Sequence, residues 1–211
     1  GGGWTFSAHA EGGYIHPLES SPGVGRDPIR ITDRFFGAQM RGFDIRGIGP
    51  RIQRIPYDDN GALITDKARV TDALGGRAYY MGRLELEFPT NSTLRNFGLR
   101  PSAFVDIGSV WSLTQPILAD TIGVCVPNTG TTGDRIELNA PGDVCPATGY
   151  TRVNGYREVF LGNSVKPRLA IGVGFNWTSP FGPLRIDIAK ALLKQEGDDP
   201  KFFSFNVGTQ F

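Results

Sequence analysis

The chain has 211 residues, of which 39% are hydrophobic and 20% charged, and its formal net charge is +1. A net charge this close to zero gives no electrostatic reason to expect a nucleic-acid partner. No run of about 18 apolar residues is present, which excludes a transmembrane helix, while 29 Gly and 14 Phe favour a β architecture.

Six segments alternate apolar and polar residues with a period of two, which predicts β-strands. In the third segment, for example, Val105 and Ile107 share one face and Asp106 lies on the other. Each segment has about 8 to 12 residues, the length that a tilted strand needs to cross a bilayer. The six segments are residues 4–15, 77–88, 99–111, 168–178, 184–191 and 202–211.

Long and short connections alternate between these strands. Residues 17–76 and 112–167 form two long connections, whereas residues 89–97 and 179–183 join their strands closely. Long loops on one side and short turns on the other are typical of bacterial outer-membrane barrels, and loops this long are uncommon in compact soluble domains. We therefore expect an all-β protein, an antiparallel transmembrane β-barrel segment with both long connections outside the cell. Alternation alone also fits a soluble β-sandwich.

The last predicted strand carries an apolar face to its end. Phe203, Phe205, Val207 and Phe211 share that face, and Gly208 lies on the opposite one. Such a strand invites aggregation in a soluble protein, but in a barrel it closes the wall and turns its apolar face to lipid. Because the sequence opens on three glycines and enters a strand at once, it reads as a piece of a longer precursor.

Two cysteines, Cys125 and Cys145, lie in the second long connection, in a stretch rich in Gly, Pro, Asn and Thr. They are either two free thiols or a loop disulfide. We favour the disulfide, because such a segment suits an oxidising compartment. Closing a loop of about 20 residues would contribute ~3 kcal/mol at best.

Arg41 lies in the first long connection, among several glycines. An arginine held inside a barrel needs a carboxylate partner with a planar, bidentate fit. Glu85 and Asp106 are inward-facing carboxylates on neighbouring predicted strands, where inward side chains can meet. The alternative is an ordinary solvated loop arginine. No catalytic triad, metal-ligand cluster or nucleotide-binding fingerprint is evident, so we expect neither enzymatic activity nor a cofactor or metal.

Several motifs resemble a known family. Met40-Arg41-Gly42-Phe43 resembles the (V/I)RG(F/Y) signature of the outer-membrane insertase family typified by BamA, with Met in place of the usual Val or Ile. In that family the sixth extracellular loop carries this signature into the barrel. Residues 104–108 match the F-x-D-x-G strand motif of the family, through Phe104, Asp106 and Gly108. Residues 176–185 resemble its closing hairpin, and the last strand resembles its β-signal.

This resemblance implies a fold and a role for the whole chain. Residues 1–211 would be the carboxy-terminal part of the barrel, the last six of sixteen strands, without the periplasmic POTRA domains. Arg41 would pair with Glu85 and Asp106, Gly42 would permit a tight bend, and Phe43 would pack against the inner wall. The protein would fold client β-barrel proteins and insert them into the bacterial outer membrane.

The implied partners are outer-membrane lipid, unfolded client proteins and the accessory lipoproteins of an assembly complex. A passive channel or two-partner secretion pore on the same architecture is the first alternative function, and a soluble β-sandwich binding module is the second. Within the family, a TamA-like protein or an organellar Sam-type protein is a further alternative.

Overall fold

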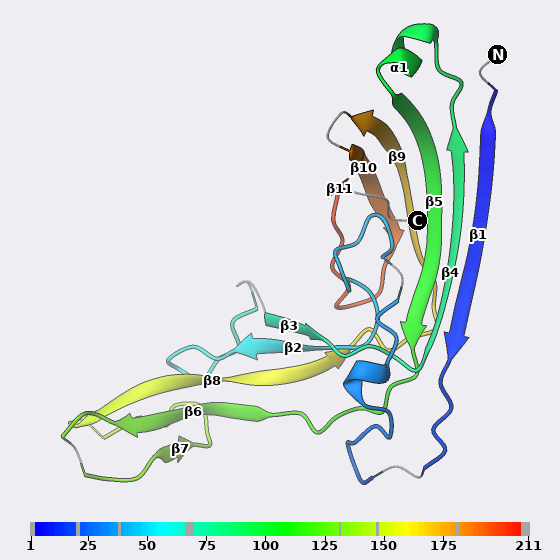
Figure 1. Cartoon of the computed structure of the whole chain (residues 1–211). Coiled ribbons are helices and arrows are strands. Elements are labelled where there is room, and N and C mark those ends of the chain that lie inside the picture. Colours follow the sequence, from blue (N-terminus) through cyan, green and yellow to red (C-terminus); the bar gives the residue numbers. More distant parts are fainter. Residues whose placement is uncertain are drawn as a thin grey trace.

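The described residues form two antiparallel sheets, a wall sheet and a loop sheet. The computed structural model describes residues 3–19, 22–37, 39–65, 70–130, 132–146, 148–179 and 182–207. The wall sheet has the strand order β1-β4-β5-β9-β10-β11, and the loop sheet has the order β3-β2-β8-β6-β7. Figure 1 shows the wall sheet as a curved surface and the loop sheet as an arm that extends sideways from one end of it.

The wall sheet consists of the six strands that alternation predicts, in the same order along the chain. Its strands are β1 (Thr5–Tyr14), β4 (Ala78–Glu87), β5 (Leu99–Trp111), β9 (Arg168–Ser179), β10 (Gly182–Leu193) and β11 (Phe203–Val207). All five strand pairs are antiparallel. The predictions for Gly208 and Phe211 lie outside the described residues, so the last strand is described only to Val207.

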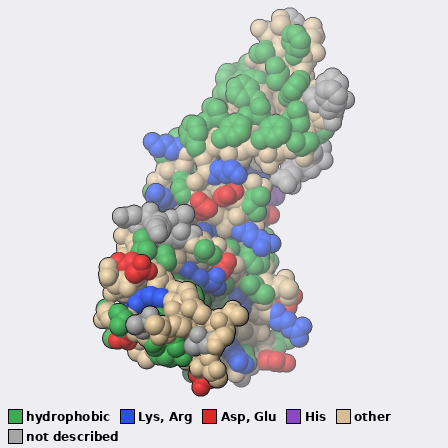
Figure 2. Space-filling model, turned by 90° about the vertical axis from the view of Figure 1, so that its left-hand side faces the viewer, with side chains coloured by type: hydrophobic (Ala, Val, Ile, Leu, Met, Phe, Trp, Pro, Cys, Tyr) green, Lys and Arg blue, Asp and Glu red, His purple; other side chains and the backbone are tan. Residues whose placement is uncertain are grey.

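Over β4, β5, β9 and β10, the wall sheet covers its polar face and exposes its apolar face. Asp106, on the concave side, has no exposed surface, whereas Val173 and Phe175 are each 43% exposed on the other side. Figure 2 shows hydrophobic side chains covering the upper part of the molecule, formed by the wall sheet, with charged side chains gathered below. A β-sandwich requires the reverse, with apolar faces packed against each other. The distribution fits a wall with lipid outside and a polar interior.

The two long connections, which the sequence analysis described as loops, contain secondary structure of their own. The first contains η1 (Ile31–Asp33), β2 (Arg51–Pro56) and β3 (Val70–Ala73), and the second contains β6 (Asp120–Pro127), β7 (Ile136–Leu138) and β8 (Tyr150–Leu161). These strands are short or interrupted by Pro and Gly, which hides their alternation. Their central pair, β2 with β8, joins the two connections to each other, so it depends on tertiary proximity.

The short connections lie at the opposite end of the wall sheet. One of them contains the single turn of helix α1 (Ser92–Asn96). Among the described residues, no helix is both long and apolar enough to cross a bilayer.

Asp27 ties the two long connections together. Its carboxylate accepts hydrogen bonds from the backbone N–H of Thr114 (2.9 Å) and of Ile29 (3.0 Å), and it lies 3.6 Å from the Arg77 guanidinium. Burial alone would raise the pKa of Asp27, but the backbone donors and Arg77 outweigh it and hold the pKa below its ordinary value. The carboxylate is therefore ionised at neutral pH and fixes both connections at the end of the wall.

A disulfide joins Cys125 of β6 to Cys145 in the β7–β8 connection, with a Cα–Cα distance of 5.6 Å. Cys125 is completely buried in the loop sheet. The pairing that the sequence favoured is therefore present, and no free cysteine occurs among the described residues.

Replacing Cys125 and Cys145 with Ser should destabilise the loop sheet alone. Losing a cross-link over a loop of this length removes ~3 kcal/mol at most, so we expect amide hydrogen exchange in β6 and β7 to accelerate by up to about a hundred-fold. Hydrogen exchange with mass spectrometry on the full-length protein checks this, with the strands of the wall sheet as the internal control. Unchanged exchange in β6 and β7 would contradict a stabilising role for the disulfide.

Candidate functional site

The segment between η1 and β2 folds back into the hollow of the wall sheet, as Figure 1 shows. We call residues 39–49 the inserted segment. Met40 and Phe43 are each 2% exposed, and they belong to one apolar cluster that joins the inserted segment to the wall. The cluster comprises Met40, Phe43, Ile48, Met81, Val110 and Ala170. Apolar packing therefore holds the inserted segment on both sides of Arg41.

Glycines allow this close approach. Gly42 has φ 85°, in the left-handed region, and a Cβ there would lie 2.7 Å from the Cβ of Ala170. Gly108 of β5 faces Met81, and a Cβ there would lie 2.9 Å from the carbonyl oxygen of Tyr80. A side chain at Gly42 would therefore force the inserted segment away from the wall, and one at Gly108 would force β5 away from β4.

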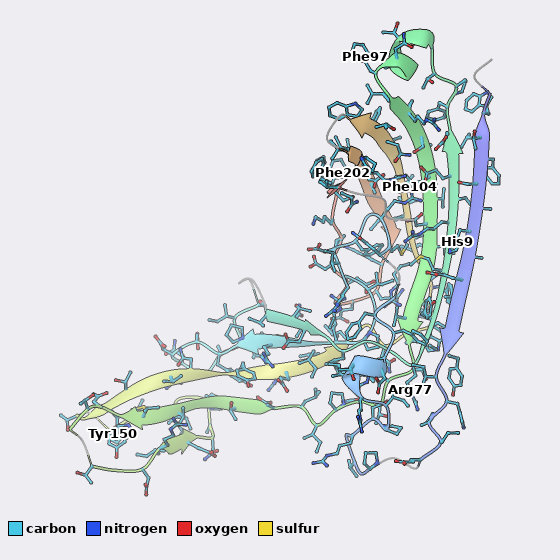
Figure 3. All side chains as sticks on the ribbon, viewed as in Figure 1. His9, Arg77, Phe97, Phe104, Tyr150 and Phe202 are labelled. Atoms are coloured by element: carbon cyan, nitrogen blue, oxygen red, sulfur yellow. A yellow bond between two sulfur atoms is a disulfide. The ribbon has the colours of Figure 1, made fainter. Side chains whose placement is uncertain are left out.

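Arg41 makes a forked ion pair with the wall. Its Nε and Nη2 donate to the two carboxylate oxygens of Asp106, at 2.9 and 2.5 Å, and its Nη1 donates to Glu85 Oε2 at 2.6 Å. The backbone N–H of Arg41 also donates to Asp106, at 3.1 Å. The guanidinium carbon lies 3.7 Å from the ring centroid of Phe104, which adds a cation–π contact. Figure 3 shows Phe104 on β5 beside the inserted segment.

The register of β4 and β5 explains why the two acids converge. Glu85 is paired with Phe104, and Arg83 is paired with Asp106, so Glu85 and Asp106 are diagonal neighbours on the concave face. The Asp106 side chain is completely buried, and those of Arg41 and Glu85 are only 12% and 15% exposed. A carboxylate buried this deeply is costly unless it is paired, so the fork accounts for the burial of Asp106. Arg83 adds a further contact by donating to the carbonyl of Gln39.

A second arginine, Arg185 of β10, extends this polar cluster. It donates to Glu85 Oε1 at 2.9 Å, to Asp187 Oδ1 at 2.9 Å and to Asn176 Oδ1 at 3.1 Å. With Ser102, which donates to Glu85 Oε1 at 2.6 Å, the cluster includes side chains from β4, β5, β9 and β10. Two arginines face three carboxylates, Glu85, Asp106 and Asp187, so the formal charge of the cluster is −1.

Arg185 of β10 reaches Glu85 of β4 across both β9 and β5, and glycine in β9 leaves room for it. A Cβ at Gly174 would lie 2.5 Å from Asp187 Oδ1 and 2.9 Å from Arg185 Nη2. A Cβ at Gly172 would lie 2.5 Å from the Phe104 ring. The Gly-x-Gly pattern of this strand therefore makes room for the buried cluster.

The sequence identified Arg41, Glu85 and Asp106 but not the roles of Arg185, Asp187, Asn176 and Ser102. Strand alternation was the available signal, since it places all four on the polar face with Glu85 and Asp106. Alternation alone could not show which of the many polar residues on that face contact Glu85 and Asp106. The predicted residues of the last strand lie elsewhere: Phe203, Phe205 and Val207 are exposed on the apolar face. Within the described ranges, no group of three His, Cys, Asp or Glu could hold a metal ion.

Comparison with known proteins places this geometry in a family. The model of the Omp85 superfamily domain matches residues 2–211. The outer membrane protein assembly factor BamA of Neorickettsia risticii (strain Illinois) is 27% identical over 189 residues, which cover 90% of this chain and 18% of that protein. The protein of the same name from Neisseria meningitidis serogroup B (strain ATCC BAA-335 / MC58) is 27% identical over 193 residues, covering 90% and 20%.

The chain thus spans about a fifth of the length of the curated relatives it matches. Among solved structures, the crystal structure of BamA from Haemophilus ducreyi lacking POTRA domains 1–3 is similar, with a TM-score of 0.48 and 22% identity. That match covers 96% of this chain and 30% of the other.

Removing one member of the fork should release the inserted segment. Asp106→Asn leaves Arg41 with only Glu85, and we expect a loss of about 3 kcal/mol in the free energy that holds the segment in place. Replacing both partners, with Arg41→Met and Asp106→Leu, should cost less because no charge is left unpaired. Limited proteolysis of the full-length protein in detergent, read at residues 39–49, measures this release.

The control for this experiment is Arg54→Ala, in the same long connection. Arg54 pairs with Asp72 and Glu158 in the loop sheet, and its side chain is 37% exposed. This substitution should leave cleavage at the inserted segment unchanged. Equal protease resistance of the wild type and Asp106→Asn would refute the anchoring role of the fork.

Gly174→Ala should disturb the cluster without removing any charge. The new methyl group displaces Asp187 or Arg185, and we expect a loss of about 1–3 kcal/mol, typical of overpacking. Gly82→Ala is the matched control on β4, because the only close contact of a Cβ there is with the Cγ2 methyl group of Ile107, at 3.1 Å, and no charged group lies within reach. Thermal unfolding, followed by heat-modified gel mobility, compares the two. A larger loss of thermal stability for Gly82→Ala would show that the cluster does not depend on the space that the missing side chain of Gly174 leaves.

Proposed function

Because this chain belongs to the Omp85 superfamily, we propose that it is the carboxy-terminal wall of a factor that folds client β-barrel proteins and inserts them into the membrane. The chain is an antiparallel β-barrel segment of a bacterial outer-membrane protein. The names of both curated relatives support an assembly role. We expect the whole barrel to have sixteen strands, of which these six are the last.

The observation that carries the proposal is the position of β11 at the edge of the wall sheet. Among the described residues, β11 pairs with β10 from Leu184–Val207 to Ile188–Phe203. The other side of an edge strand leaves its backbone N–H and C=O groups open to pairing with a further strand. A client strand can add to such an edge through main-chain hydrogen bonds.

The work proposed here is strand pairing and needs no chemical step, so we propose a protein that is not an enzyme and uses no cofactor. The exposed apolar residues of the wall, such as Phe203 and Phe205, fit contact with the lipid of the outer membrane. Unfolded outer-membrane proteins are the proposed clients. Accessory lipoproteins of an assembly complex are a further expectation from the resemblance.

The inserted segment argues against the alternative of a passive or secretion pore. Its apolar cluster and the Arg41 fork occupy the concave side of the wall, where a pore would need water. A segment held by buried ion pairs leaves this space only at considerable cost.

Reconstitution tests the proposed function directly. The full-length protein, placed in liposomes, should increase the rate at which an unfolded client barrel reaches its heat-modifiable folded form, compared with empty liposomes. A cysteine at Asn206 of β11 should cross-link to client strands during assembly, and one at Val105, in the middle of the wall, should not. Ion conductance without any gain in client folding would favour the pore instead.

A further inference from the structure

The inserted segment is joined by its backbone to the turn that precedes β11. The N–H of Asp44 donates to the carbonyl of Asp199 (2.9 Å), and the N–H of Asp199 donates to the carbonyl of Gly47 (2.8 Å). The N–H of Lys201 donates to the carbonyl of Gly42 (3.0 Å). Phe43 and Pro200 are bridge partners between these hydrogen bonds. The two segments therefore form a short antiparallel ladder, which we call the clasp.

The clasp is close-packed as well as hydrogen-bonded. A Cβ at Gly47 would lie 2.7 Å from the carbonyl oxygen of Asp199, so no side chain fits there. Lys201 Nζ also lies 3.1 Å from Asp44 Oδ1, but both side chains are nearly half exposed. Such a pair contributes little. The backbone ladder is therefore the main link between the inserted segment and the turn.

A fully buried ion pair fixes the turn itself. Arg168, the first residue of β9, donates from Nε to Asp198 Oδ2 at 3.0 Å and from Nη2 to Asp198 Oδ1 at 3.2 Å, and neither side chain is exposed. The N–H of Gln195 also donates to Asp198, at 2.6 Å. Since Asp198 precedes Asp199 directly, this pair determines where the turn presents its half of the clasp.

Arg168 is in turn held by the surrounding wall. Its Nη1 donates to Ser109 Oγ (2.7 Å) and to the carbonyl of Ser164 (2.8 Å), and its Nη2 donates to the carbonyl of Gly162 (2.8 Å). These partners come from β5 and from the β8–β9 connection. The guanidinium therefore has a fixed position to which Asp198 is tied.

From this arrangement we propose that Arg168 and Asp198 are positioning residues that couple the inserted segment to the last strand. They hold the turn where the clasp can form, so that the inserted segment and the start of β11 move as one unit. The inference rests on the proposed function in one respect: it makes the opening of the β11 edge depend on how firmly Arg41 is anchored.

The chain lengths between these points leave little slack. Asp44 lies three positions after Arg41, and Phe203, where β11 begins, lies two positions after Lys201. Consecutive Cα atoms lie about 3.8 Å apart, so a large displacement at Arg41 cannot be absorbed before it reaches β11. By linkage, the coupling is reciprocal: loosening of β11 weakens the hold on the inserted segment by the same free energy.

Hydrogen exchange on the full-length protein in lipid nanodiscs tests the coupling. Arg41→Ala and Gly47→Ala should each accelerate exchange at residues 203–207 by about ten-fold or more, since both weaken the chain of contacts that ends at β11. Arg54→Ala, in the loop sheet, should leave that exchange unchanged. Release of the inserted segment in Arg41→Ala without any change at residues 203–207 would overturn the proposal.

Asp198→Asn tests the positioning role itself. It should accelerate exchange in residues 42–47 and 203–207 and leave the β4–β5 pair unchanged. A disulfide between Asp44→Cys and Lys201→Cys, introduced into this variant, should restore slow exchange in both regions, because it closes the clasp without Asp198. Uniform acceleration across the wall, or no rescue by the disulfide, would show that Asp198 supports only general stability.

None of these exchange measurements requires a client protein. Client folding by the same samples, measured in liposomes, therefore reports on the proposed function separately. Coupling with no client folding would leave the positioning role intact and refute the assembly role. Client folding without coupling would refute the positioning role and leave the assembly role intact.

Discussion

The burial of Asp106 is the constraint on which the rest of this structure depends. A carboxylate without exposed surface needs a cation held close to it, and Asp106 pairs with Arg41, which does not belong to a strand of the wall. The cation comes instead from a connection, which must fold back into the hollow of the wall to deliver Arg41. The burial of Met40 and Phe43 and the left-handed conformation of Gly42 follow from that insertion.

This constraint also explains features that would weaken an ordinary sheet. Glycines within a strand reduce its stability, yet Gly172 and Gly174 occupy the centre of β9. They are tolerated because Phe104 and Arg185 fill the space where side chains would stand. The wall therefore combines an outer surface that suits lipid with a concave side whose charges are neutralised almost completely by one another.

Both long connections help to hold the inserted segment against the wall. One supplies Arg41 and the other supplies Thr114, which Asp27 ties to the first. Their strands combine into the loop sheet, with a disulfide at its far side. The clasp adds a third contact, between the inserted segment and the turn before β11. The anchored inserted segment and the edge strand β11 are thus parts of one connected structure.

The six wall strands, their order and their two faces could be predicted from the sequence alone, because a period of two is a local property that needs no knowledge of neighbours. The sequence also identified Arg41 with its acids, through the resemblance of residues 40–43 and 104–108 to a family. The sequence did not predict the loop sheet, the contact of Arg185 with Glu85 past Gly174, or the pairing of Arg168 with Asp198, 30 residues apart. These contacts join segments that are distant along the chain or separated by a strand, and their partners are chosen by register and by the space that glycines leave.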